Sequence, residues 1–149
     1  MKKIAIVFNL MLTISSCNKD NGSNDSWSFN WSHQNISHSA TSADAYISQV
    51  GLGLGPNQIV ATISSSGPNY RVSMRLSSLS PNSYPVSLTS NKFAYVDDSG
   101  YNLAGAQGTV TISSNSNNKV TGSFSVKLIN PSSDTTGITG SFTNINLHP

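Results

Sequence analysis

Few side chains in this sequence could carry out acid–base or nucleophilic chemistry: there are three histidines, six aspartates, one cysteine and no glutamate. A nucleophile–base pair needs a histidine within hydrogen-bond reach of its partner and held in orientation by a third group. His33 and His38 flank a polar stretch, and His148 lies next to the last residue. No Gly-x-Ser-x-Gly motif accompanies them. We therefore interpret the histidines as exposed loop residues and predict no catalytic residue.

Metal coordination has little support in the spacing of the same residues. His33 and His38 are five positions apart and have no second pair of ligands, which argues against zinc. Asp97 and Asp98 could offer oxygens to Ca²⁺, but their segment lacks the spacing of a calcium-binding loop. Asp-Ser-Gly is ordinary turn chemistry, with Gly100 supplying a positive φ. The sequence predicts a turn here, no metal site and no cofactor.

Aromatic side chains are the remaining candidates, because sugar rings stack on aromatic faces and a barrel interior can hold an apolar molecule. Large aromatic residues more often supply core area, and that alternative stays open for each of them. The candidate ligand-binding residues are Trp27, Trp31, Tyr46, Tyr70 and Tyr95.

The elements that must position these side chains are strands, because apolar residues recur with a period of two. In the longest run, Val120, Phe124 and Leu128 share one face with Gly122 and Val126. A phase change late in the final run indicates a bulge. Short polar links separate the runs and imply antiparallel neighbours. We expect an all-β fold, an antiparallel meander of about eight to ten strands that forms a β-sandwich or a flattened barrel.

The amino-acid composition supports the all-β class and limits the kinds of binding partner. Ser, Thr and Asn are abundant, and Ser and Asn compete with helical hydrogen bonds. The net charge of +2 comes from Lys2 and Lys3, since residues 17–149 hold six basic residues and six aspartates. No basic stripe is apparent, which argues against nucleic acid as a partner. With one cysteine, no intramolecular disulfide can form.

Cys17 lies where a bacterial lipid anchor would be attached. It follows two lysines, an apolar run and two serines, which is the pattern of a secretory signal. The sequence Ile-Ser-Ser-Cys at 14–17 resembles the lipobox of bacterial lipoproteins, and the apolar run is too short to span a bilayer. We predict a lipoprotein signal peptide over residues 1–16, lipidation of Cys17, a lipid-anchored flexible tether over residues 17–26 and a single all-β domain over residues 27–149.

Two segments near the end of the chain resemble a known family. Residues 120–126 read Val-Thr-Gly-Ser-Phe-Ser-Val and residues 138–142 read Ile-Thr-Gly-Ser-Phe. Together they are similar to the closing hairpin of a family of small uncharacterised Bacteroidota lipoproteins. Tyr84 and the stretch from Phe93 to Tyr95 resemble the middle of that family, although Ser83 replaces its glycine. The resemblance implies an all-β fold and a lipid anchor, and it carries over no activity or site residue. In this hairpin we expect Gly122 and Gly140 to face a bulky ring on the adjacent strand.

From these features we predict a lipid-anchored protein of the cell envelope, at the outer membrane on its periplasmic face or the cell surface. Its domain would be a non-catalytic binding or surface-interaction module for a glycan or protein ligand. One alternative is a lipocalin-like carrier of a small apolar ligand, with a cavity lined by Met74, Phe124 and Val126. Another is a hydrolase, which requires an aspartate and a histidine that meet in one cleft.

Overall fold

The computed structural model describes residues 26–47, 57–63 and 69–149, and these residues form ten β-strands. The strands are β1 (Ser28–His33), β2 (Ile36–Ser39), β3 (Ser42–Tyr46), β4 (Gln58–Ile63), β5 (Tyr70–Arg75), β6 (Asn82–Ser87), β7 (Lys92–Val96), β8 (Asn102–Ser116), β9 (Lys119–Ile129) and β10 (Thr135–His148). The predicted all-β class is confirmed. Across the described residues no helix is long and apolar enough to cross a membrane. The predicted signal peptide and Cys17 lie outside the described residues, as does the tether up to residue 25.

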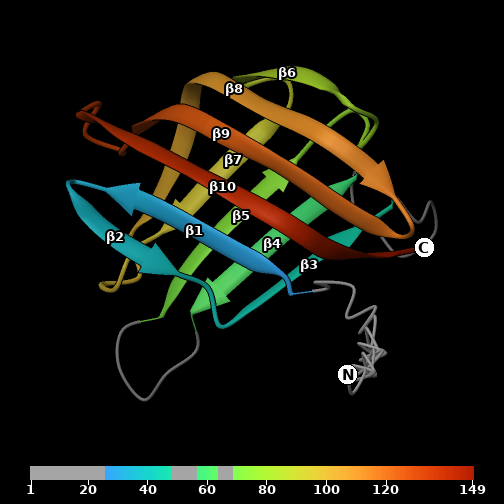
Figure 1. Ribbon diagram of the computed structural model, residues 1–149. Helices are drawn as coiled ribbons and strands as arrows, with labels where there is room; N and C mark the ends of the chain where they lie inside the picture. Colours follow the sequence, from blue (N-terminus) through green and yellow to red (C-terminus); the bar gives the residue numbers. More distant parts are fainter. Residues whose placement is uncertain (1–25, 48–56, 64–68) are drawn as a thin grey trace, which may run out of the picture.

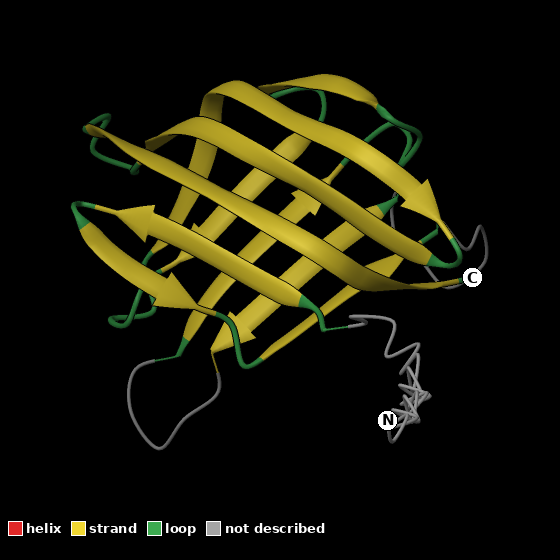
Figure 2. Cartoon of the chain, in the orientation of Figure 1, coloured by secondary structure: helices red, strands yellow, loops and turns green. Residues whose placement is uncertain are grey.

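Seven strands close into a barrel, which Figures 1 and 2 show from the side. In order around it they are β3, β4, β5, β7, β8, β9 and β10, and β10 returns to β3. The β1–β2 hairpin continues the sheet along the other part of β10, and β6 runs along β8. Of the two predicted architectures, the β-sandwich is wrong and the barrel is correct, because the sheet closes on itself through β10 and β3.

The predicted antiparallel meander is wrong in two places. β10 pairs with β3 in parallel, from Asn146 opposite Asp44 onwards. In addition, β5 pairs with β7 and not with β6, which lies on the far side against β8. The link from β5 to β6 buries Leu79, whose carbonyl accepts a hydrogen bond from Asn115 Nδ2 at 3.1 Å. Because of this packing, the chain crosses to β8, and β6 pairs there.

The predicted alternation of apolar and polar residues along the strands directs apolar side chains into the barrel. Phe29 stacks on Phe142 with ring centroids 5.6 Å apart, and Phe93 packs against Phe124 at 5.2 Å. Burying such rings removes large apolar areas from water and stabilises the closed sheet. Three residues named for a carrier cavity belong to this continuous core, namely Met74, Phe124 and Val126.

Two glycines make room for these rings, as predicted. Gly122 pairs with Phe142 across the β9–β10 ladder, and Gly140 pairs with Phe124. A Cβ at Gly122 would lie 2.6 Å from Phe142 Cζ, and a Cβ at Gly140 would overlap the Phe124 ring. Each ring therefore covers the glycine of the neighbouring strand, which only a residue without a side chain allows.

The hairpin turns use residues that tolerate a left-handed backbone. Gln34 and Asn35 join β1 to β2 with φ values of 50° and 63°, and Asn117 and Asn118 join β8 to β9 with 52° and 57°. Two consecutive positive φ values match the right-handed twist of the flanking strands. Gly100, in the turn before β8, has the positive φ that the sequence predicted, at 77°.

Three connections meet at one end of the barrel, on the left in Figures 1 and 2. They are the β1–β2, β7–β8 and β9–β10 turns, and β5 begins beside them. β7, β8, β9 and β10 pair antiparallel in succession, so the β7–β8 and β9–β10 turns lie at the same end, and the β1–β2 turn joins them because β1 is antiparallel to β10. Side chains that are distant in sequence are thereby brought together around one opening.

Candidate ligand-binding cleft

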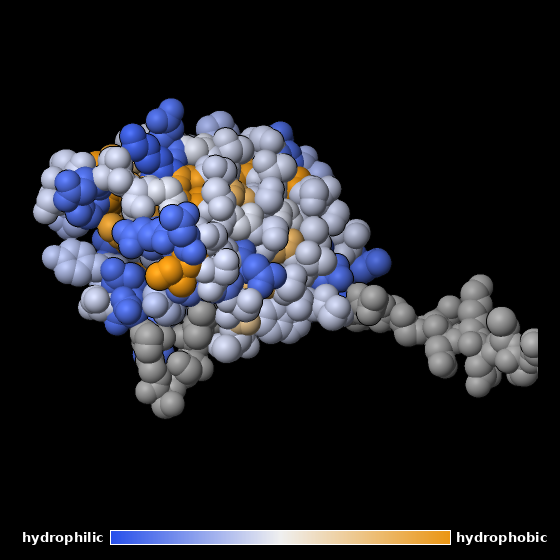
Figure 3. All heavy atoms as spheres, turned by 60° about the vertical axis from the view of Figure 1, so that its left-hand side comes forward, coloured by the Kyte–Doolittle hydropathy of each residue, from blue (hydrophilic) through white to orange (hydrophobic). Residues whose placement is uncertain are grey.

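A cleft of about 460 Å³ opens at this end of the barrel. Its walls come from the β1–β2 hairpin, the start of β5, the end of β7 with the turn that follows, the start of β8 and the β9–β10 turn. Figure 3 turns this end toward the viewer and shows strongly hydrophilic side chains gathered around apolar atoms. The volume is in the range of small-molecule sites.

Alternating aromatic and imidazole rings form the inner wall of the cleft. The His33 ring packs on Tyr95 with centroids 4.7 Å apart, and the His38 ring packs on Tyr70 at 4.4 Å. Tyr70 and Tyr95 stack at 6.4 Å, and Trp31 stacks on His38 at 5.2 Å. We call these five residues the aromatic–histidine cluster. Each ring holds its neighbours in place, so the wall is organised without a ligand.

The interpretation of His33 and His38 as exposed loop residues is wrong. His33 is the last residue of β1, and the alternation of Phe29 and Trp31 places it on the inner face with only 8 % of its surface exposed. His38 lies within β2, opposite Trp31, and is partly buried. The polar stretch between the histidines is a two-residue turn and a strand, and this tight hairpin directs both rings inward.

Two ring nitrogens in this region are buried without a hydrogen-bond partner in the protein, Trp31 Nε1 and His33 Nε2. The indole N–H of Trp31 approaches the Tyr95 hydroxyl closely enough to act on its pKa, but the pair lies outside hydrogen-bonding geometry. An unsatisfied buried polar group costs about 1–3 kcal/mol. Such a cost beside a cleft points to a role in binding rather than in folding alone.

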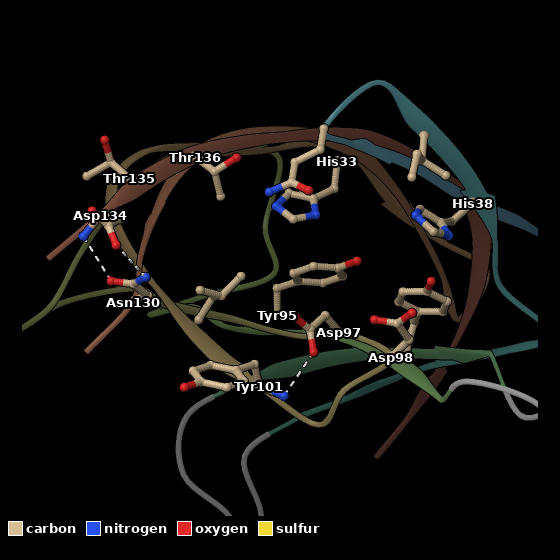
Figure 4. Close-up of a pocket in the computed structure, with 14 residues that line it drawn as sticks. His33, His38, Tyr95, Asp97, Asp98, Tyr101, Asn130, Asp134, Thr135 and Thr136 are labelled. Carbon is tan, nitrogen blue, oxygen red and sulfur yellow. Dashed lines mark hydrogen bonds between the residues drawn. The ribbon is translucent and has the colours of Figure 1, made fainter. Parts of the chain in front are cut away.

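Carboxylates line the cleft from two turns, as Figure 4 shows. Asp97 and Asp98 follow β7, and Asp134 precedes β10. Asp97 Oδ1 accepts the backbone N–H of Tyr101 at 2.9 Å and that of Ser99 at 3.0 Å. This is the predicted turn chemistry, and it is confirmed. The turn therefore holds the first carboxylate rigidly at the rim of the cleft.

The β9–β10 turn holds the third carboxylate in a similar way. Asn130 Nδ2 donates to Asp134 Oδ2 at 3.1 Å, and the Asp134 backbone N–H donates to Asn130 Oδ1 at 2.8 Å. The NH2 group and the oxygen of the Asn130 side chain are thus both used within the turn. The second oxygen of the Asp134 carboxylate accepts no hydrogen bond from the described residues and is available on the cleft wall.

The protonation of the rings follows from burial and from these carboxylates. Burial lowers the pKa of His33, and nearby His38 lowers it further, while Asp97 opposes the change. Burial also lowers the pKa of His38 against an opposing effect of Asp98. Both imidazoles are therefore neutral at pH 7.

The tyrosine hydroxyls respond to the same surroundings. Burial raises the pKa of Tyr95 to about 12. Partial burial raises the pKa of Tyr70, and the Asp98 carboxylate, with which its hydroxyl interacts, raises it further. Both hydroxyls consequently keep their protons at neutral pH, and the formal charge of the cleft comes from its aspartates alone.

The structure separates the five predicted ligand-binding residues. Tyr70 and Tyr95 line the cleft, and Trp31 lies behind them with 2 % of its surface exposed. Trp27 precedes β1 and Tyr46 ends β3, so both lie toward the opposite end of the barrel, where Tyr46 stacks on the ring of His148. Whether any of the five binds a ligand stays a prediction.

Comparison with known proteins gives one match. A family model described as a domain of unknown function, DUF6252, covers residues 25–146. The chain belongs to the DUF6252 family. No curated protein and no solved structure matches the chain. The predicted membership of an uncharacterised family is thus confirmed, and the match includes every strand of the barrel except the last residues of β10.

In this DUF6252 chain, the sequence did not predict that the charged residues of the cleft lie close together. The sequence predicts a turn at Asp97 and Asp98 and loop positions for His33 and His38. Asp134 is one of only four aspartates in the predicted domain, but neither its spacing nor that of Asn130 indicates a binding role. The available signal was positional, because His33, Asp97 and Asp134 each lie beside a hairpin turn.

The chemistry of the cleft is that of hydrogen bonding and charge. Within the described residues no group of three or more His, Cys, Asp or Glu side chains could hold a metal ion. The lining there contains three aspartates and two neutral histidines but no lysine or arginine. The arrangement can bind a small polar molecule between the aromatic–histidine cluster and the acidic turns.

Proposed function

We propose that this DUF6252 protein is a non-catalytic binding module of the cell envelope that takes a small polar ligand in the cleft at the end of its barrel. The observation that carries this proposal is His33: a polar ring 8 % exposed, with Nε2 lacking a protein partner, on the wall of a cleft of about 460 Å³. Buried polar groups in proteins are nearly always hydrogen-bonded, so the unpartnered nitrogen calls for a partner such as a bound ligand or an ordered water.

Attachment through lipid on Cys17 completes the proposal. It is supported by the lysines, apolar run and small residues that precede the cysteine, and by the resemblance to Bacteroidota lipoproteins. Three acyl chains would hold the protein in the outer membrane, since each buried methylene contributes about 0.8 kcal/mol. Cells that express the chain would incorporate labelled palmitate into it, and Cys17→Ser would abolish the label. Equal labelling of both chains would refute lipidation at this residue.

The carrier alternative has less support from the interior of the barrel. Met74, Phe124 and Val126 were expected to line its cavity, but they pack in the continuous core with at most 4 % of their surfaces exposed. The cleft lies outside that core and has charged walls. A polar ligand therefore fits the site better than an apolar one.

The test of binding uses the purified full chain and compares two tyrosines. Tyr101 is exposed and lines the cleft, whereas Tyr46 is exposed near the opposite end. Glycan arrays and mixed small-molecule libraries supply ligands, and the ring resonances of His33 and His38 in NMR spectra report occupancy of the cleft. We expect Tyr101→Ala to weaken a hit and Tyr46→Ala to leave it unchanged. Binding that needs Tyr46 or Trp27 and ignores Tyr101 would refute the cleft as the site.

A hydrolase is the second candidate, and it is supported by histidines and aspartates that line the same cleft. His33 lies near Asp97, and His38 lies near Asp98, in one cleft. A neutral histidine beside a carboxylate can take a proton from a bound hydroxyl or water. Incubation with libraries of glycosides and esters would detect turnover, and His38→Gln should remove it while the protein stays folded. Turnover that is unaffected by substitution of either histidine would exclude this function.

A further inference from the structure

The walls of the cleft have an unbalanced charge. Asp97, Asp98 and Asp134 face it from opposite turns, and the described lining residues include no basic side chain with a permanent charge. The histidines supply no compensation because both are neutral at pH 7. A ligand of opposite charge would supply the counter-charge that the lining lacks.

The basic residues of the barrel lie elsewhere. Arg71, Arg75 and Lys92 line a separate groove on the outer face of β5 and β7, where Arg75 is directly opposite Lys92 in the register. Arg71 follows Tyr70 along the strand, so its side chain points to the other face of the sheet. The nearest arginine of β5 is therefore directed away from the aspartates of the cleft.

The hydrogen-bonding groups of the cleft favour a ligand that donates. Three carboxylates accept only, and the Asp98 carboxylate lies close enough to the Tyr70 hydroxyl to raise its pKa. The Asn130 amide is used within its own turn. The His33 ring points into the cleft above Tyr95, and a neutral imidazole offers one nitrogen as an acceptor. The wall also offers neutral donors on Gln34, Tyr95, Tyr101, Thr135 and Thr136, but its charged groups only accept.

We infer that the cleft binds a small organic cation, a molecule with an ammonium or guanidinium group held between the aspartates and the aromatic–histidine cluster. The inference rests on the proposed function of the same cleft and names its ligand class. Ammonium and guanidinium groups carry only donors, and their charge is stabilised both by carboxylates and by aromatic faces. The buried, unpartnered His33 nitrogen is the independent sign that this acidic wall belongs to a site.

Two other ligand classes fit less well. A divalent metal ion needs several ligands that converge, and no group of three acidic, histidine or cysteine side chains does so in the described residues. A neutral sugar would leave the aspartates without a counter-charge.

The test compares three four-carbon probes with positive, zero and negative charge: 1,4-diaminobutane, 1,4-butanediol and succinate. Each is titrated into the full chain, with the ring resonances of His33 and His38 and isothermal calorimetry as readouts. We expect saturable binding of the diamine, weakened by added salt, and no binding of the diol or of succinate. A charged hydrogen bond lost from such a site costs about tenfold in affinity.

The variant Asp98→Asn removes one carboxylate without changing its size, and Asp44→Asn is the matched control. Asp44 is exposed on β3 and pairs with His148, outside the cleft, so both variants change the net charge equally. We expect Asp98→Asn to weaken diamine binding about tenfold and Asp44→Asn to leave it within about twofold. Equal weakening by both variants would show nonspecific charge attraction and overturn the inference.

The possible results test the ligand class and the proposed binding function separately. If the diol, succinate or a sugar shifts the histidine resonances and the diamine does not, the cation inference fails while a binding cleft stands. If the diamine shifts them and Asp98→Asn reduces its affinity selectively, the inference holds. If neither these probes nor the libraries move the histidine resonances, the inference fails together with the proposed function.

Discussion

The contact between Gly140 and Phe124 gives the sharpest prediction about the stability of the barrel. Gly140 lies in β10 between β1 and β9, opposite Trp31 on one side and Phe124 on the other. An alanine Cβ at this position would be 2.8 Å from Phe124 Cε1 and 2.5 Å from the carbonyl oxygen of Asn30, whereas ordinary contact begins at 3.4 Å. The ring can tilt, but the carbonyl belongs to a paired strand and cannot yield without disturbing the ladder.

The expected magnitude follows from this overlap. Overpacking a core by one methyl group costs about 1–3 kcal/mol, and contact with fixed backbone places Gly140→Ala near the upper end. Replacing glycine within a strand returns roughly 0.5–1 kcal/mol. We therefore expect a net loss of about 2 kcal/mol in the free energy of unfolding. In a domain of this size that corresponds to a fall of roughly 8 °C in Tm.

Gly137→Ala is the control on the same strand, because a Cβ there would meet nothing within 4 Å. Urea denaturation of both variants should show a loss for Gly140→Ala and no loss for Gly137→Ala. Adding Phe124→Leu to Gly140→Ala should recover part of the loss, since the two residues share one contact. Wild-type stability in Gly140→Ala, or equal losses in both glycine variants, would refute the packing argument.

Three further predictions concern the cleft and the opposite end of the barrel. Asp97→Ala removes the acceptor of two backbone N–H groups and should cost about 1–2 kcal/mol in urea denaturation, whereas Asp97→Asn, which keeps an oxygen, should cost less. The free energy of unfolding should fall as the pH drops below 6.5, because the unfolded chain then protonates His33 and His38 while their lowered pKa values keep the folded rings neutral. Urea denaturation near pH 7.5 and pH 5.5 checks this prediction. The double variant with glutamine at both positions should show a smaller difference in the free energy of unfolding between the two pH values. An unchanged difference would contradict the assignment of the pH dependence to these two histidines. Asp44→Asn breaks the exposed pair with His148, 2.9 Å long, and should change stability by less than about 1 kcal/mol.

The aromatic–histidine cluster links the stability of the barrel to its proposed function. Its rings pack as core residues, yet His33 and Trp31 each leave a nitrogen without a partner. An apolar ring of similar size would avoid that cost, so the polar nitrogens are a feature that packing alone does not require. Functional sites are the usual places where a fold departs from its best packing.

Local features of this fold could be predicted because they depend on neighbouring residues. Alternation assigned the inner face of β9, and the phase change in β10 predicted the bulge that the register shows between Phe142 and Ile145. The Asp97 turn and the left-handed Gly100 followed from turn chemistry. The glycines that face rings also followed, since β9 and β10 are joined by a short turn that sets their register.

Tertiary structure alone decided how the strands close and what they enclose. Alternation distinguishes the two faces of a strand but does not say which strand lies beside it, so the parallel pairing of β10 with β3 and the displacement of β6 were out of reach. The cleft depends on those choices. Asp98 and Asp134 belong to separate turns, and barrel closure brings them to one opening with His33. The sequence by itself determined strands, turns and an inner face, because these arise from contacts between near neighbours. The site arises from pairing between residues far apart along the chain, and the energies of such pairings are settled only when the whole sheet has closed.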